Sequence, residues 1–305
     1  MTASVFIDGE AGTTGLQIRD RLLARGDIRL VQVDPARRKD AVARREAFAA
    51  ADVAILCLPD EAAIEAVALC EGLTTRIIDA STAYRVNPEW AFGFAELSSG
   101  NRERIVTADR VSNPGCYSTG SIALLAPLVA AGLIDPDAGL TINAVSGYSG
   151  GGKSLIAEFE AGTAGAHFVY GLEHKHKHIP EIMVHAGLSR RPIFIPAVGN
   201  FAQGMIVQVP LHLPKGQTAG DLQAALVAHY EGARFVRVVD GASLAARVNP
   251  ERLNGTNVME LSVHAGPDGD RVVLLATLDN LGKGASGAAV QNLNLMLGME
   301  EGAGL

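Results

Sequence analysis

The first eighty residues alternate between short apolar runs and amphipathic helical patterns, and this alternation constrains the fold more than any other feature. Strands that alternate with helices at this spacing form βαβ units, in which the strands lie parallel within one sheet. The expected strands are residues 5–8, 28–34, 53–58 and 76–80, and the expected helices are residues 15–25 and 64–71. A parallel sheet is therefore predicted for the N-terminal part of the chain.

A glycine-rich loop joins the first predicted strand to the first predicted helix. Gly9, Gly12 and Gly15 follow a G-x-x-G-x-x-G spacing, and Thr13 and Thr14 stand before the last glycine. Glycines let the backbone approach a pyrophosphate, and a helix N-terminus supplies N–H donors and positive potential. Because the spacing departs from the commoner G-x-G-x-x-G, a glycine turn that binds no nucleotide is the alternative. The strand, loop and helix context favours a dinucleotide site formed by these five residues.

The end of the second predicted strand carries two conflicting cues about the cofactor. Asp34 could bind a ribose 2′-OH, as an acid does at this position in NAD-binding folds. Arg37, Arg38 and Lys39 follow at once, and such cations suit a 2′-phosphate. We favour NADP, with Arg37 and Arg38 as phosphate ligands, because three adjacent cations outweigh one carboxylate. A solvated basic loop is the alternative.

After residue 115 the pattern changes to longer strands, several with two-residue alternation, which is typical of a mostly antiparallel sheet. The expected strands are residues 141–146, 205–213, 235–239, 258–265 and 271–278, with a hairpin connection at 265–270. We therefore predict an α/β fold with two domains. Residues 1–114 form a Rossmann-type dinucleotide-binding domain, completed by a C-terminal helix within 282–305. Residues 115–281 form an α+β domain with a mostly antiparallel sheet, for catalysis, substrate binding and dimerisation.

Composition limits the possible partners and the compartment. The 305-residue chain has a net charge of −7, which gives no support to nucleic-acid binding, and no apolar run is long enough to span a bilayer. Three cysteines, an odd and sparse set, do not form a disulfide framework and favour the cytoplasm. Cys57 and Cys70 lie in apolar strand and helix runs and are expected to be structural.

Cys116 is the candidate nucleophile. A Pro114-Gly115 turn delivers it to the start of an apolar helical stretch at residues 121–133. Backbone N–H groups and the dipole at a helix N-terminus favour a thiolate over a thiol. A thiolate attacks acyl carbons, provided that a base and a place for the oxyanion are available. The alternative is a small buried cysteine.

Three histidines lie close together at residues 173–182, a segment that also holds two lysines and two glutamates. In an extended segment His174, His176 and His178 would point to one side, which invites a metal site. The intervening lysines oppose a cation, and the sequence holds no second ligand cluster, so we predict no metal. A base for Cys116 is the simpler role, and we favour His176 with His178 adjacent. A solvated polar loop is the alternative.

Residues 147–154 (GYSGGGKS) match the nucleotide phosphate-loop pattern letter for letter. This match would make the protein an ATP-dependent kinase or ATPase. However, the loop lies mid-chain after a complete dinucleotide-type unit, and no parallel α/β series follows it. We therefore discount the ATP interpretation.

Together these segments resemble the N-acetyl-γ-glutamyl-phosphate reductases of arginine biosynthesis, in their shorter form. The matching segments, beside the Gly9 to Gly15 loop, are DASTAYR at 79–85, NPGCY at 113–117, SGYSG at 146–150, HKHIPE at 176–181 and DNLGKGA at 279–285. The wider family includes aspartate-semialdehyde dehydrogenase, which has a similar two-domain plan. The resemblance covers nearly the whole chain.

The resemblance implies an NADP-dependent reduction of an acyl phosphate to a semialdehyde through a thioester on Cys116. It implies that Arg85 contacts the substrate phosphate, and we assign Ser149 and Glu181 to the substrate as well. Ser81, Asn280, Gly282, Lys283 and Gly284 would contact the cofactor. The small-molecule substrate could be the free acetyl compound, a carrier-bound relative from a lysine pathway, or aspartyl phosphate. A homo-oligomer, either a dimer or a tetramer, is expected.

Overall fold

The computed structural model describes residues 2–244 and 246–305, and these fold into two compact units. The first unit holds the chain up to Ala95 together with Ser99–Pro114 and Ala285–Leu305. The second unit holds Glu96–Ser98 and Gly115–Gly284. The chain thus passes from one unit to the other directly before Gly115 and directly after Gly284.

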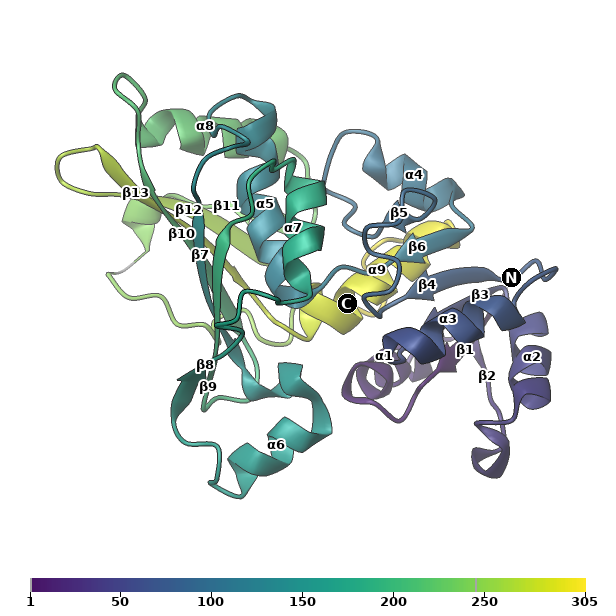
Figure 1. Cartoon of the computed structure of the whole chain (residues 1–305). Coiled ribbons are helices and arrows are strands. Elements are labelled where there is room, and N and C mark those ends of the chain that lie inside the picture. The colour runs from purple at the N-terminus through teal and green to yellow at the C-terminus, as the bar shows by residue number, and fades with distance from the viewer. Residues whose placement is uncertain (1, 245) are drawn as a thin grey trace. The chain divides into compact units, whose positions relative to one another are not determined.

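The first unit contains a parallel sheet whose strands run in the order β2-β1-β3-β4-β6-β5 (Figure 1). Each neighbouring pair is parallel, as the alternation of strands and helices predicts. The strands are β1 (Ala3–Asp8), β2 (Ile28–Val31), β3 (Val53–Leu56), β4 (Arg76–Asp79), β5 (Ala91–Phe92) and β6 (Arg110–Ser112). The second strand is shorter than expected, because Asp34 already caps a short 3₁₀ turn at Pro35–Arg37.

Helices cover both faces of this sheet. Successive side chains of a strand point to opposite faces, and here both sets of side chains are apolar. Val5 and Ile7 pack with Ile18 of one helix set, whereas Phe6 packs with Phe48 and Ala63 of the other. The first set is α1 (Thr13–Leu23), α4 (Asn101–Thr107) and α9 (Gly287–Met296), and the second is α2 (Ala41–Ala49) and α3 (Asp60–Leu69). Both faces are therefore apolar, which explains the nearly continuous hydrophobic runs of the strands.

The second unit contains a mixed sheet in the order β11-β12-β13-β10-β7-β9-β8. Its pairs are antiparallel, except that β11 pairs with β12 and β7 with β9 in parallel. The strands are β7 (Thr141–Gly147), β8 (His167–Val169), β9 (Ile193–Gly199), β10 (Met205–His212), β11 (Val236–Val238), β12 (Met259–Ala265) and β13 (Arg271–Leu278). The expected hairpin joins β12 to β13. The predicted fold class, a Rossmann-type unit beside a unit with a mostly antiparallel sheet, is confirmed.

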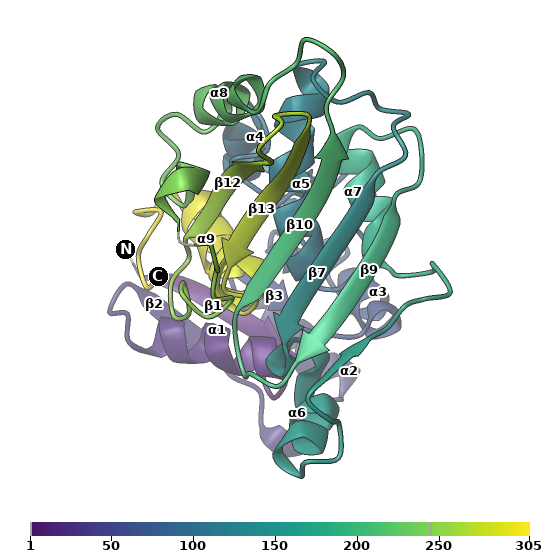
Figure 2. The same cartoon turned by 90° about the vertical axis from the view of Figure 1, so that its left-hand side faces the viewer.

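One face of the second sheet carries helices and the other is uncovered (Figure 2). The central helix α5 (Cys116–Ala130) is buried on almost every side, and Gly120 lies directly against Val207 of β10. Beside it lie α7 (His178–Ala186) and α8 (Ala219–His229), whereas α6 (Gly152–Glu160) follows β7 at one end. Within the described residues, no helix combines the length and the apolar character needed to cross a bilayer.

Candidate active site

Cys116 is the first residue of α5, five residues earlier than the start of the apolar stretch identified in the sequence. Gly115 is the N-cap, and its carbonyl accepts hydrogen bonds from the hydroxyls of Ser118 (2.9 Å) and Thr119 (2.8 Å). These back-bonds let buried hydroxyls fit into an otherwise apolar helix. The partly exposed Cys116 thiol thus sits at the positive end of a buried 15-residue helix, an environment that favours the thiolate.

Glu181 of α7 fixes the turn before the nucleophile. Its Oε1 accepts a hydrogen bond of 2.8 Å from the backbone N–H of Gly115, and its side chain is buried, with 1% exposure. The N–H of an N-cap residue needs a partner when it is buried, and a carboxylate is a strong acceptor. Glu181 therefore supports the Cys116 turn directly, a relationship that the local sequence does not reveal.

His176 and His178 come together at the start of α7, with ring centroids 4.7 Å apart. The segment is not extended as expected, because His174 adopts a left-handed φ of 57° and His178 is already helical. The backbone N–H of His178 donates to Nδ1 of His176 at 3.2 Å, so the neutral imidazole carries its proton on Nε2. Burial, aided by the charge of Lys177, lowers the pKa of His176 to about 4.

Aromatic rings surround this histidine pair. The Tyr117 ring lies 6.1 Å from that of His176, and the rings of Tyr170 and Phe194 lie 5.6 Å and 5.0 Å from it. Tyr117 directly follows the nucleophile, and its hydroxyl donates to the carbonyl of Ala197 at 2.8 Å. These contacts place the histidines beside the N-terminal turn of α5 in an apolar setting, which disfavours charged imidazolium.

The turn after β13 also reaches Cys116. A Cβ at Gly284 would lie only 3.0 Å from Cβ of Cys116, so the backbone at this position lies directly against that residue. The Gly284 N–H donates to the carbonyl of Asp279 at 3.0 Å. The buried carboxylate of Asp279 accepts bonds from the side chain of Gln203 and from the backbone of Gly255 and Leu281. The turn is therefore held rigidly from its Asp279 end.

The remaining predicted residues of this turn also have internal partners. Asn280 donates to the hydroxyl of Ser149 (3.0 Å) and accepts from the Gly204 N–H (2.8 Å). Gly282 lies against the carbonyl of Thr256. Lys283 is 1% exposed and forms an ion pair with Glu96 at 2.8 Å. These contacts link the turn to the 3₁₀ turn after β7 and to the loop before β10.

The phosphate-loop match at residues 147–154 does not lie in a nucleotide-binding setting. Its strand β7 pairs antiparallel with β10, whereas the phosphate-loop fold needs a parallel α/β series. A short 3₁₀ turn at Tyr148–Gly151 leads into α6, and the Tyr148 ring stacks on that of Phe159 at 4.9 Å. The glycines therefore serve a compact turn.

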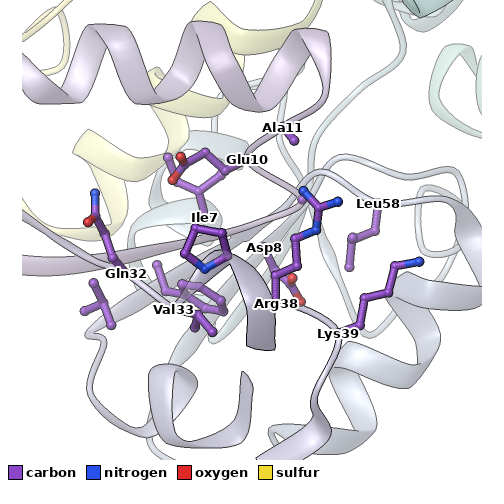
Figure 3. Close-up of a pocket in the computed structure, with 13 residues that line it drawn as sticks. Ile7, Asp8, Glu10, Ala11, Gln32, Val33, Arg38, Lys39 and Leu58 are labelled. Atoms are coloured by element: carbon purple, nitrogen blue, oxygen red, sulfur yellow. The ribbon is translucent and has the colours of Figure 1, made fainter. Parts of the chain in front are cut away.

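In the first unit a pocket of about 560 Å³ opens at the end of β1 (Figure 3). Gly9 has a φ of +87°, and a side chain there would strike the carbonyl of Cys57. A Cβ at Gly15 would lie 2.7 Å from the Gly9 carbonyl oxygen. Gly12 is the N-cap of α1, whose first residues are Thr13 and Thr14. The loop thus has the tight backbone and the helix N-terminus that a pyrophosphate requires.

Arg38 and Lys39 line this pocket, whereas Arg37 does not. Arg37 pairs with Asp40 at 3.0 Å, and the Asp34 carboxylate accepts from the Ala36 N–H at 2.9 Å. The Asp34 carboxylate is thus engaged in capping its own turn. Two cations remain on the pocket wall, which suits a 2′-phosphate.

Asp8 at the pocket wall is a residue that the sequence analysis missed. Its carboxylate forms a buried ion pair with Arg44, with the Nη2 to Oδ2 distance at 2.6 Å. Burial raises the pKa of Asp8, although the hydrogen bond from Arg44 opposes this shift. Asp8 could have been found from the sequence, because it is an acidic residue at the end of the first strand, directly before the first glycine of the loop.

Ser81 and Arg85 lie on the loop after β4, also in the first unit. The Ser81 hydroxyl donates to the buried Asp79 carboxylate at 2.7 Å. Arg85 is 8% exposed and donates to the carbonyls of Asn113 and Ala80, each at 3.0 Å. Backbone carbonyls thus orient this guanidinium.

Comparison with known proteins shows two matches to family models. Residues 11–108 match the NAD-binding domain of the semialdehyde dehydrogenases, and residues 116–280 match their dimerisation domain. An N-acetyl-γ-glutamyl-phosphate reductase of Rhizobium etli is 53% identical, with 97% of this chain and 99% of that protein covered. The one from Brucella ovis is 54% identical, with 98% and 100% covered. The chain belongs to the N-acetyl-γ-glutamyl-phosphate reductase family.

The fold of this reductase family member also resembles solved aspartate-semialdehyde dehydrogenases. The enzyme II of Vibrio cholerae, complexed with ASA, has a TM-score of 0.72 at 15% identity, with 97% of this chain and 98% of that chain covered. A Candida albicans enzyme with NADP has a TM-score of 0.66 at 12% identity, with 97% and 99% covered. At such identities the likeness concerns the fold alone. The much higher sequence identity to the N-acetyl-γ-glutamyl-phosphate reductases supports membership of that family over aspartate-semialdehyde dehydrogenase and over a kinase.

The residues expected from the reductase resemblance therefore fall into two groups. The second unit brings together Cys116, His176, His178, Glu181, Ser149, Asn280 and Gly282 to Gly284. The first unit holds the glycine loop, Arg37, Arg38, Ser81 and Arg85. Sequence reasoning missed the ion-pair partners Asp8, Arg44 and Glu96, of which Arg44 and Glu96 carry no local motif.

Proposed function

We propose that this chain catalyses the NADPH-dependent reduction of N-acetyl-γ-glutamyl phosphate to N-acetylglutamate 5-semialdehyde, with release of phosphate. The observation that carries the proposal is Cys116 at the N-terminus of the buried helix α5, held by Glu181 through Gly115. The names of relatives at 53% and 54% identity supply the substrate. This chemistry needs a reduced thiol, which fits a cytoplasmic location.

The Cys116 thiolate attacks the γ-acyl carbon, forms a C–S bond and expels phosphate as the C–O bond to phosphate breaks. Bound NADPH supplies the hydride that reduces the thioester. The resulting hemithioacetal loses the thiolate as the C–S bond breaks, and the aldehyde leaves. The α5 N-terminus stabilises the thiolate before it attacks the acyl carbon and again after the C–S bond breaks.

The histidine pair manages protons at the acyl oxygen and the thiol. His176 accepts the His178 N–H at Nδ1, so its Nε2–H is available as a donor toward an oxygen of the substrate. His178 is 5% exposed and opens α7. We assign the general acid and base role to this pair.

Several side chains support the proposed substrate and cofactor contacts. Arg85 is a guanidinium suited to the phosphate dianion, and Ser149 lies beside Asn280 in the second unit. The hydrogen bond of Glu181 to Gly115 favours a supporting role for this carboxylate over direct substrate contact. The pocket at the glycine loop fits NADPH, with Arg38 and Lys39 toward the 2′-phosphate. Ser81 and the turn at Asn280, Gly282 and Gly284 are assigned to the nicotinamide end.

A second copy of the chain would cover the open face of the second sheet. Register places Asn143, Val145, Ile195, Gln208 and Val273 on this face, opposite to Phe194, which packs on Tyr117 of α5. Ile193 on the same face is 51% exposed. The matching family model is described as a dimerisation domain. In light scattering, Val273→Glu should therefore shift the protein toward monomer.

The reverse reaction tests the proposed activity. N-acetylglutamate semialdehyde, phosphate and NADP are mixed with the enzyme, and NADPH is followed by absorbance. Turnover is expected, and Cys116→Ser should abolish it without changing the affinity for NADPH. Turnover with aspartate semialdehyde instead would overturn the substrate and keep the reaction class. No turnover with any semialdehyde would overturn the proposal.

A further inference from the structure

Lys283 and Glu96 form a buried ion pair in the second unit. The ammonium lies 2.8 Å from each carboxylate oxygen, and the side chains are 1% and 8% exposed. The ammonium also lies 5.7 Å from the centre of the Phe235 ring. A buried charge without its counterion is strongly disfavoured, so each side chain fixes the position of the other.

Both residues lie on segments where the chain passes between the units. Glu96 begins the short stretch Glu96–Ser98, which belongs to the second unit although the residues on either side belong to the first. The Glu96 carbonyl lies 3.1 Å from Nε2 of His229 on α8. Lys283 lies in the π turn Gly282–Ser286, next to the last residue of the second unit. The ion pair therefore joins two chain segments that are 187 residues apart.

The residue after Lys283 lies against the nucleophile. At Gly284 a Cβ would be 3.0 Å from Cβ and 3.4 Å from Cα of Cys116. The turn is anchored at its Asp279 end by hydrogen bonds and at its Gly284 end by the neighbouring Lys283 ion pair. Movement of Lys283 would consequently change the surface against which Cys116 packs.

We propose that Lys283 and Glu96 are a positioning pair that holds the Gly284 backbone against Cys116 and so fixes the direction of the thiol. The inference rests on the proposed role of Cys116 as the nucleophile. It replaces a direct cofactor contact by Lys283, which the resemblance implied, because the ammonium is already paired with a carboxylate. A small displacement of a nucleophile lowers the rate strongly.

The test compares Glu96→Gln, Lys283→Met and the double variant with the wild-type enzyme. Measured quantities are kcat, the Kd for NADPH by fluorescence, the melting temperature, and the pH dependence of Cys116 alkylation by iodoacetamide. We expect kcat to fall at least about tenfold, with the Kd for NADPH within about twofold of wild type. The alkylation midpoint should rise by about half a pH unit, because the thiolate is held less closely to the α5 N-terminus.

The double variant separates positioning from stability. Each single variant removes this ion pair and leaves one buried charge without that counterion, so its melting temperature falls, and the double variant should regain most of that loss. We expect its kcat to stay low. Recovery of kcat together with the melting temperature would overturn the proposal, because the pair would then serve stability alone. A raised Kd for NADPH with an unchanged alkylation profile would overturn it in favour of a cofactor contact.

Two further measurements provide a stability control and a test of coupling between Glu96 and Gly284. Glu301→Gln breaks a partly buried ion pair with Arg102 in the first unit and should lower the melting temperature without changing kcat. Because Glu96 and Gly284 act on the same contact, the effects of Glu96→Gln and Gly284→Ala on kcat should be less than additive. Alkylation of Cys116 requires no substrate. If the wild-type enzyme does not turn over the proposed substrate but the alkylation midpoint still shifts in the variants, the proposed substrate is rejected and the positioning role is kept.

Discussion

The carboxylate of Glu181 accepts a hydrogen bond from the backbone N–H of Gly115, at 2.8 Å and across 66 residues of sequence. This bond connects α7 to the turn that carries Cys116. Cys116 is therefore held from a second helix as well as by its own. The same helix begins at His178, two residues after His176, so Glu181 and the histidine pair lie near one end of α7.

Glu181→Ala should lower both the reductase activity and the free energy of unfolding. The buried Gly115 N–H loses its acceptor, which costs about 1–3 kcal/mol. Glu181→Gln keeps an oxygen at the same place and should retain most of the stability, as measured by urea unfolding. If the glutamine variant unfolds as easily as the alanine variant, the hydrogen bond to Gly115 is not what the side chain contributes.

Gly284→Ala should lower kcat by about one to two orders of magnitude. The added Cβ would meet Cys116 at 3.0 Å and the Asp279 carbonyl at 3.1 Å, so the thiol must shift. Gly220→Ala is the matched control in the same unit, because its Cβ would have only an ordinary contact at 3.5 Å. Stopped-flow measurement of NADPH oxidation gives the rate. Wild-type kcat in Gly284→Ala would contradict the close approach.

The low pKa of His176, about 4, predicts how stability depends on pH. The folded pKa lies below the usual 6.5, so the unfolded chain takes up a proton first as the pH falls. The contribution of neutral His176 to the free energy of unfolding is complete above about pH 6.5 and is lost as the pH falls toward 4. Urea midpoints at pH 7 and pH 5 should therefore differ less in His176→Gln than in wild type. His174→Asn is the control at an exposed, left-handed residue, and an equal pH response in all three proteins would contradict the prediction.

The cofactor pocket predicts which cations recognise the 2′-phosphate. Lys39→Ala and Arg38→Ala should each raise the KM for NADPH about tenfold, the usual effect of losing one charge-assisted hydrogen bond, with little change for NADH. Arg37→Ala is the matched control, since Arg37 pairs with Asp40 and does not line the pocket. Steady-state kinetics with both cofactors gives the result. A larger effect from Arg37→Ala than from Lys39→Ala would contradict the assignment.

The sequence by itself determined the fold class and the family. In β1, Val5 and Ile7 face one helix layer and Phe6 faces the other, so a short apolar run already specifies a strand covered on both sides. The Gly9 to Gly15 loop and the turn before Cys116 are likewise local, because they depend on the backbone freedom of glycine and on the start of a helix. Such features are encoded within a few neighbouring residues, where the periodicity of side chains and the backbone preferences act directly.

Only the tertiary structure decided which partners these residues have. The sequence places Arg37, Arg38 and Lys39 side by side, but the path of the 3₁₀ turn directs only the last two to the pocket. Glu181 meets Gly115, and Lys283 meets Glu96, across 66 and 187 residues. Such pairs depend on where the folded chain returns, and burial then makes each partner necessary to the other. The candidate nucleophile was therefore visible in the sequence, whereas the groups that contact its turn became visible only in the fold.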